Sequence, residues 1–197
     1  MQQSNPSRRV ALPKSVQLSM FRRDSWLCRW CSKPVIFGPA MKLLEVELRT
    51  SGMDGALAYY HPHWTRATAP LLDELGAVLD HVEAFSAGGE CVENNLVTAC
   101  AKCNGRKSAA PLEDWNKRLI RKPIKGKYGE PQVWDGLSSV FVMLAGRHPS
   151  KLTTGEREWL KAMKAQEPPI FPDTVAKQFV RFRIWRGAPI ADTYGAR

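Results

Sequence analysis

Residues 80–107 read DHVEAFSAGGECVENNLVTACAKCNGRK, and this stretch does most to define the fold. It begins with an adjacent acid and histidine, passes through a Gly-Gly turn and an Asn-Asn-Leu-Val segment, and ends on a Cys-x-x-Cys pair that runs into Asn-Gly-Arg-Lys. Upstream, Cys28 and Cys31 form a second pair of the same spacing. A general base, a hard metal ligand and half of a structural metal site therefore lie in one short segment.

The two Cys-x-x-Cys pairs predict a tetrahedral zinc site with ligands Cys28, Cys31, Cys100 and Cys103. Two residues between cysteines let both thiolates point at one ion from a tight turn, and two such turns complete the coordination. Unpaired buried thiols and a redox Cys-x-x-Cys are the alternatives. Four thiolates leave no open position for chemistry, so this zinc would be structural. The fifth cysteine, Cys91, has no partner spacing and is expected to be a free thiol.

The Asp80-His81 dipeptide predicts a hydrolytic site at the end of a strand. Successive strand side chains point to opposite faces, but both can reach one site where the strand runs into a loop. An imidazole with a reference pKa near 6.5 can take a proton from water at neutral pH. A carboxylate is a hard ligand for a divalent cation. An isolated Asp-His pair is usually structural, so the interpretation depends on the residues that follow.

Hydrophobic patterning around this dipeptide predicts an α+β fold. Short apolar runs at 78–81 and 95–98 flank a loop that contains Gly88-Gly89, which predicts a two-stranded hairpin. A helix is expected from about Ala101, and further helices are expected over 15–24 and near Val140. A capping box at Thr153 and Glu156 predicts another helix start.

Residues 24–33 and 80–107 together resemble the HNH endonuclease family. The first segment is similar to the family's Arg-Asp-x-x-x-Cys-x-x-Cys opening, and the second to its Asp-His…Gly-Gly…Asn-Leu…Cys-x-x-Cys-Asn-x-x-Lys core. The resemblance implies a ββα-metal core, two strands and a helix around one catalytic divalent ion. Ala84 occupies a position where many relatives carry proline, which is a detail of the loop.

The same resemblance implies a role for each polar residue of the core. His81 would be the general base, and Asn95 would hydrogen-bond across the hairpin and hold the loop that orients it. Asp80 and Asn104 would bind the catalytic ion. Position 104 is often histidine in the family, and an amide oxygen is harder than imidazole, so the pair should favour Mg²⁺ or Mn²⁺. Lys107 and Arg106 would contact phosphate near the cut.

The charge distribution favours nucleic acid as the partner. The formal net charge is +10, and residues 1–97 hold 10 Lys/Arg against 10 Asp/Glu, so the whole excess lies in the second half. A solvated basic surface is the simplest reading of any basic face, but so complete an asymmetry favours a polyanion. The polar start predicts no secretory signal, no apolar run predicts a membrane span, and the cysteine usage favours a reducing cytoplasm.

The chain divides into three expected parts. Residues 1–13 form a flexible basic arm, and residues 14–108 form the nuclease domain with an insertion at 39–77. Residues 109–197 form a basic, mainly helical extension of unknown role. The insertion carries His61 and His63 in the segment YYHPHW, where an aromatic loop packed on the core is a simpler reading than a metal site.

The predicted function is metal-dependent hydrolysis of DNA phosphodiester bonds, by nicking or full cleavage. Two other classes stay open. One is a zinc-knuckle module that binds nucleic acid without cutting it, and the other is a nuclease directed at RNA or branched DNA. Adjacent acid and base beside a second hard ligand favour the enzyme, because a pure binder needs no general base.

Overall fold

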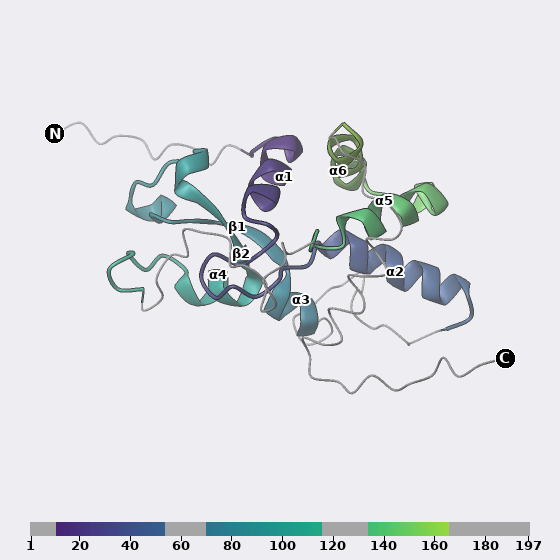
Figure 1. The fold of residues 1–197 in the computed structure, drawn as a ribbon, viewed down its shortest axis with the longest axis horizontal. Helices are drawn as coiled ribbons and strands as arrows, with labels where there is room; N and C mark the ends of the chain where they lie inside the picture. The colour runs from purple at the N-terminus through teal and green to yellow at the C-terminus, as the bar shows by residue number, and fades with distance from the viewer. Residues whose placement is uncertain (1–10, 54–69, 116–133, 166–197) are drawn as a thin grey trace.

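The computed structural model describes residues 11–53, 70–115 and 134–165 (Figure 1). Its architecture is mixed α+β, as predicted, with one two-stranded antiparallel sheet and helices on either side of it in the chain. The basic N-terminal arm up to residue 10, the YYHPHW segment and residues 166–197 fall outside these ranges. Within them, no helix has both the length and the apolar character needed to cross a membrane.

The sheet is a hairpin of β1 (Ala77–His81) and β2 (Leu96–Cys100). The register places Asp80 opposite Val97 and His81 opposite Leu96, so β1 ends at the histidine, as the sequence predicts. All five residues of β2 are buried, whereas β1 is buried only at Asp80. A sheet of two strands is marginal alone and needs packing on both faces. That packing comes from helices before and after it in the chain.

Helix α4 (Ala101–Lys107) follows β2 without a loop. The Sγ of Cys100 accepts a hydrogen bond of 3.4 Å from the backbone N–H of Cys103, which caps the first turn. Ser108 then adopts a φ of 49° and ends the helix. Hairpin and helix together form the expected ββα unit, with α4 next to both strands (Figure 1).

Helix α1 (Lys14–Arg23) packs against β2, and α3 (Pro70–Leu75) leads into β1 and packs against α4. Trp26 and Phe21 stack with ring centroids 4.9 Å apart where α1 ends. The predicted helix at 15–24 is therefore confirmed to within a residue. A short parallel bridge between Ile36 and Gly76 ties the chain after the first cysteine pair to the residue before β1.

A second group of helices consists of α2 (Gly38–Thr50), α5 (Ser138–Arg147) and α6 (Thr154–Lys164). Helix α2 packs against α5, and α6 packs against both α5 and α1, so the two groups share one core (Figure 1). The predicted capping box is present: Thr153 Oγ1 accepts from the N–H of Glu156, and the Glu156 carboxylate accepts from the N–H of Thr153. Helices α2, α5 and α6, from the expected insertion and extension, thus form one helical layer, whereas α3 of the insertion packs against α4.

Candidate metal-dependent nuclease site

The four predicted cysteines gather into one cluster. Their Sγ atoms all lie within 4.8 Å of one another, and those of Cys31 and Cys100 are 3.9 Å apart. A tetrahedral zinc ion with Zn–S bonds near 2.3 Å separates its sulfurs by about 3.8 Å. Cys28, Cys100 and Cys103 are buried and Cys31 is half-buried. The residues therefore fit a closed tetrahedral site, and the cluster could hold a metal ion.

The backbone prepares this cluster from both sides. The turn that carries Cys28 and Cys31 is closed by hydrogen bonds from the Cys28 N–H to the Lys33 carbonyl and from the Ser32 N–H to the Cys28 carbonyl, at 2.9 and 2.8 Å. The Arg29 N–H donates to the Thr98 carbonyl on β2 at 2.8 Å. This bond holds the first cysteine pair beside the strand that ends in the second pair.

The electrostatics of the cluster also suit a cation. Hydrogen bonds from the Cys100 thiol, together with others in the cluster, raise the pKa of Cys28. The Cys100 thiol in turn lowers the pKa of Cys31 to about 7. Four adjacent sulfurs thus favour one thiolate and resist further ionisation, because like charges repel in a buried site. A divalent cation removes that resistance and lets the remaining thiols ionise as ligands.

Three predicted site residues line a cavity at the end of the hairpin, away from the cysteine cluster. Asp80, His81 and Asn104 line it together with the loop residues 84–86 and the end of α4, and its volume is about 380 Å³. Asp80 and His81 come from the last two residues of β1, and Asn104 comes from the middle of α4. Because β1 ends here, the adjacent residues Asp80 and His81 both line the same cavity. Carboxylate and amide oxygens are the ligands that Mg²⁺ and Mn²⁺ prefer, so this donor set fits a hard divalent ion.

Asp80 is buried between two side chains. Its Oδ2 accepts a hydrogen bond of 2.8 Å from the indole N–H of Trp30, and its Oδ1 lies 3.7 Å from the Nζ of Lys107. Burial raises the pKa of the Asp80 carboxyl, although the Lys107 charge and the Trp30 hydrogen bond act in the opposite direction. A buried carboxyl group with a perturbed pKa at the wall of a cavity is a candidate functional group.

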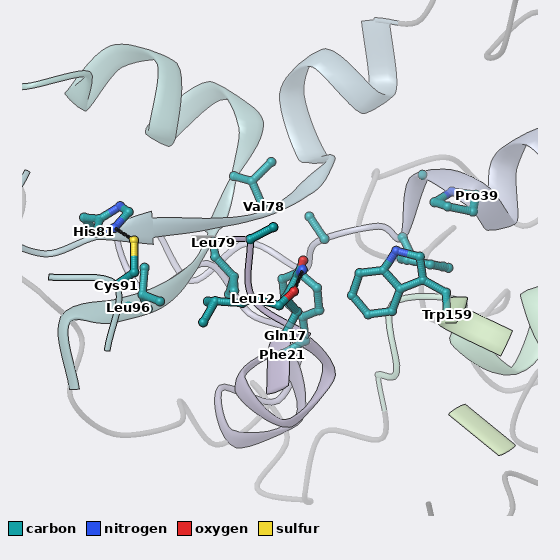
Figure 2. Close-up of a pocket in the computed structure, with 14 residues that line it drawn as sticks. Leu12, Gln17, Phe21, Pro39, Val78, Leu79, His81, Cys91, Leu96 and Trp159 are labelled. Carbon is teal, nitrogen blue, oxygen red and sulfur yellow. Dashed lines mark hydrogen bonds between the residues drawn. The ribbon is translucent and has the colours of Figure 1, made fainter. Parts of the chain in front are cut away.

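His81 lies between this cavity and a larger one. The larger cavity, about 630 Å³, is lined mainly by apolar residues of β1, of the segment before α1 and of the start of α2. His81 and Cys91 lie at one end of it and Trp159 at the other (Figure 2). The Nε2 of His81 lies 3.2 Å from the Sγ of Cys91 (Figure 2). The His81 ring is tilted against that of Phe85, with centroids 6.0 Å apart. The histidine is half-buried and is held from the loop side of the hairpin.

Asn95 braces the loop that joins the two strands. Its Oδ1 accepts from the Glu83 N–H at 2.8 Å, and its Nδ2 donates to the carbonyls of Glu83 and Glu90 at 3.1 and 3.0 Å. Gly89 lies inside this bracket, where an added Cβ would approach the Glu83 carbonyl oxygen to 2.0 Å. The Gly-Gly turn therefore contains a position that only glycine fills. These bonds tie the end of the loop to Glu83, two residues after His81.

Lys107 and Arg106 occupy different environments, although both end α4. Arg106 is exposed. Lys107 is buried, with 0% of its side chain exposed, and its Nζ donates to the His81 carbonyl at 2.7 Å. The structure thus departs from the expected phosphate contact of Lys107. The side chain follows Asn104 by one turn on the face that packs against the hairpin, so it points inward to His81 and Asp80.

Sequence reasoning did not foresee the contacts that Trp30, Asp24 and Cys91 make with the hairpin and its loop. It named Asp24 only as part of the family's opening and Cys91 only as a free thiol. Trp30 lies between two zinc-spaced cysteines, where attention falls on the sulfurs. Asp24 belongs to the Arg-Asp opening, and it binds the hairpin through the Thr98 N–H at 2.8 Å. Cys91 has no spacing signal, since it meets His81 only when the loop folds back.

Comparison with protein-family models matches residues 72–110 to the HNH endonuclease family. The matched segment contains the whole hairpin, α4 and the second cysteine pair. This part of the chain thus matches the HNH endonuclease domain, which supports a nuclease-type function and a nucleic-acid substrate in general. No curated protein and no solved structure matches the chain.

Proposed function

We propose that this protein is an endonuclease that hydrolyses DNA phosphodiester bonds with a divalent metal ion and His81 as the general base. The observation that carries the proposal is the shared cavity of Asp80, His81 and Asn104 at the end of the hairpin. Hydrolysis of a phosphodiester needs an activated water and a cation near the charge that develops on the phosphate. This cavity brings the groups for both tasks to one place.

Asp80 and Asn104 would hold Mg²⁺ or Mn²⁺, which supplies positive charge for the phosphate and the leaving oxygen. His81 would accept the proton of the attacking water through a ring nitrogen, because imidazole titrates near neutral pH. Asn95 would keep the loop closed around the histidine through its three hydrogen bonds to the backbone. The four-cysteine cluster would bind zinc and take no part in the chemistry.

Substrate contact would come from exposed basic side chains. Arg106 lies on α4 two residues after Asn104 and is exposed, so it is the nearest candidate for a phosphate contact. The excess of Lys and Arg in residues 98–197 would add a grip on the backbone that weakens with salt and carries little sequence preference. Duplex DNA is the proposed target.

The test is cleavage of supercoiled plasmid by purified protein in Mg²⁺, in Mn²⁺ and in chelator. We expect nicking in either metal and none in chelator. His81→Ala should lower the rate by about 10²- to 10⁴-fold, the usual contribution of a positioned base. His148→Ala is the matched control, since His148 binds Glu47 on the helical layer and should leave the rate unchanged.

Labelled single strands, RNA and branched junctions, run beside the duplex, distinguish the target. Preferential cutting of RNA or of junctions would replace the proposed substrate and keep the chemistry. Binding of DNA without cleavage in any metal would overturn the proposal and favour a module that only binds nucleic acid.

A further inference from the structure

Asp80 contacts two residues, each of which belongs to a segment that carries one of the cysteine pairs. Trp30 lies between Cys28 and Cys31 in the first half. Lys107 is the last residue of α4, the helix that begins at the second half. The Trp30 indole donates to Oδ2 of Asp80 at 2.8 Å, while the Lys107 ammonium lies 3.7 Å from Oδ1. The cysteine cluster and the nuclease cavity are thus joined through one carboxylate.

We propose that Trp30 is a positioning residue: its indole N–H fixes the Asp80 carboxylate for the catalytic divalent ion and thereby couples the cysteine cluster to the metal site. The inference rests on the proposed function, because it takes Asp80 as a ligand of that ion. It adds a role for a residue between two structural cysteines.

The indole itself is tightly packed, as a positioning residue requires. Trp30 is 3% exposed, and its ring meets Trp115 edge-on with centroids 6.1 Å apart. The Nζ of Lys107 lies 5.7 Å from the ring centroid on another side. Backbone bonds on the preceding residue, from the Arg29 N–H to the Thr98 carbonyl, fix the chain next to it. The N–H direction is therefore set by the packed core and the cysteine turn.

The contact also leaves the carboxylate able to bind metal. An ionised carboxylate offers about four lone-pair positions, and the Trp30 bond uses one of them on Oδ2. The distance of 3.7 Å from Lys107 to Oδ1 exceeds hydrogen-bond length, so the lysine stabilises the charge without occupying the oxygen closely. The remaining lone-pair positions stay available to a cation. Donors of this kind behind metal ligands typically change metal affinity or activity by about 10- to 100-fold.

Trp30→Phe isolates the hydrogen bond, because phenylalanine keeps an aromatic ring in the packed position and lacks the N–H. The readout is Mn²⁺ binding, followed by the electron paramagnetic resonance signal of free Mn²⁺ during titration of zinc-loaded protein. We expect about tenfold weaker binding by Trp30→Phe than by wild type. Zinc content, measured on the same samples, should stay at the wild-type level.

Trp134→Phe is the matched control. Trp134 is also buried, and its indole N–H donates to the Val35 carbonyl at 2.7 Å, outside both the cluster and the cavity. The Trp134→Phe variant should lose thermal stability, because it too lacks a buried indole N–H, and it should bind Mn²⁺ with wild-type affinity. Asp80→Asn sets the baseline, and it should remove the tight Mn²⁺ site.

The outcomes separate the two claims. Wild-type affinity in Trp30→Phe, with a tight site that Asp80→Asn abolishes, overturns the positioning role and leaves the proposed function intact. Equal weakening in Trp30→Phe and Trp134→Phe also overturns it, because the effect then follows general destabilisation. If wild type and Asp80→Asn bind Mn²⁺ equally, or neither binds it tightly, both the inference and the metal chemistry on which it rests are overturned.

Discussion

Two buried aspartates differ in how their carboxylates are bound: Asp24 contacts the β-hairpin from the end of α1, and Asp80 belongs to strand β1 of that hairpin. Asp24 is 2% exposed and its oxygens are saturated: Arg23 donates two hydrogen bonds of 3.1 Å, Arg29 donates one of 2.6 Å, and the Thr98 N–H donates one of 2.8 Å. Asp80 is 5% exposed, accepts one side-chain hydrogen bond from Trp30, and borders a cavity.

The two pKa shifts follow from this difference. Burial acts to raise the pKa of Asp24, but hydrogen bonds from Arg23, Thr98 and Arg29 outweigh it and hold the pKa below its ordinary value of 3.8. At Asp80 burial prevails and the pKa is raised. A buried carboxylate with all its partners is structural, whereas one with unfilled positions beside a cavity is a candidate ligand for a cation. Asp24 is thus bound as part of the fold, and Asp80 is the candidate for the proposed chemistry.

The largest effect on folding should come from Asp24→Asn. The amide cannot pair with two arginines, and removal of one partner from a buried ion pair costs about 3–5 kcal/mol. We expect the free energy of unfolding to fall by that amount, measured by urea denaturation at neutral pH. A loss below about 1 kcal/mol, the scale of an exposed pair, would show that Asp24 is not the structural member of the comparison.

Lowering the pH should change the contributions of Asp24 and Asp80 to the free energy of unfolding in opposite directions. Each change should be smaller than the loss caused by Asp24→Asn. Because the pKa of Asp24 is lowered on folding, its stabilisation is complete above pH 3.8 and is lost as the pH falls through the folded value. Asp80 acts in reverse, because its pKa is raised: protonation stabilises the fold, and that stability is lost as the pH rises through the folded value.

Denaturation curves between pH 3 and pH 7 test these signs. The stability gap between wild type and Asp24→Asn should shrink toward low pH. As the pH falls, the free energy of unfolding of wild type should rise relative to that of Asp80→Asn, because only the carboxyl group can take up a proton. A gap to Asp24→Asn that stays constant with pH would contradict the assigned ion pairs.

The sequence predicted local features of the site well, and for a physical reason. The cysteine cluster follows from two-residue spacings, and a turn fixes such spacings without knowledge of the rest of the fold. The hairpin, the start of α4 and the capping box at Thr153 follow from equally local signals. The resemblance to a known family supplied the pairing of Asp80 with Asn104, which the shared cavity supports.

Features that depend on distant packing were not predicted. Asn-x-x-Lys spacing places Lys107 on the face of Asn104, but the sequence cannot tell whether that face meets solvent or the hairpin. The packing of α2 on α5 joins segments about 100 residues apart, so no local pattern contains it.

Plasmid nicking in Mn²⁺ by Asp80→Asn and Asp24→Asn, beside wild type and at a temperature where all three are folded, tests the central claim most directly. Our account predicts that Asp24→Asn retains the cleavage rate of its folded fraction, because its carboxylate acts on stability alone. It predicts that Asp80→Asn loses cleavage by at least about 10²-fold, since the divalent ion loses its charged ligand. Equal rates in the two variants would contradict the assignment of Asp80 to the metal-dependent chemistry.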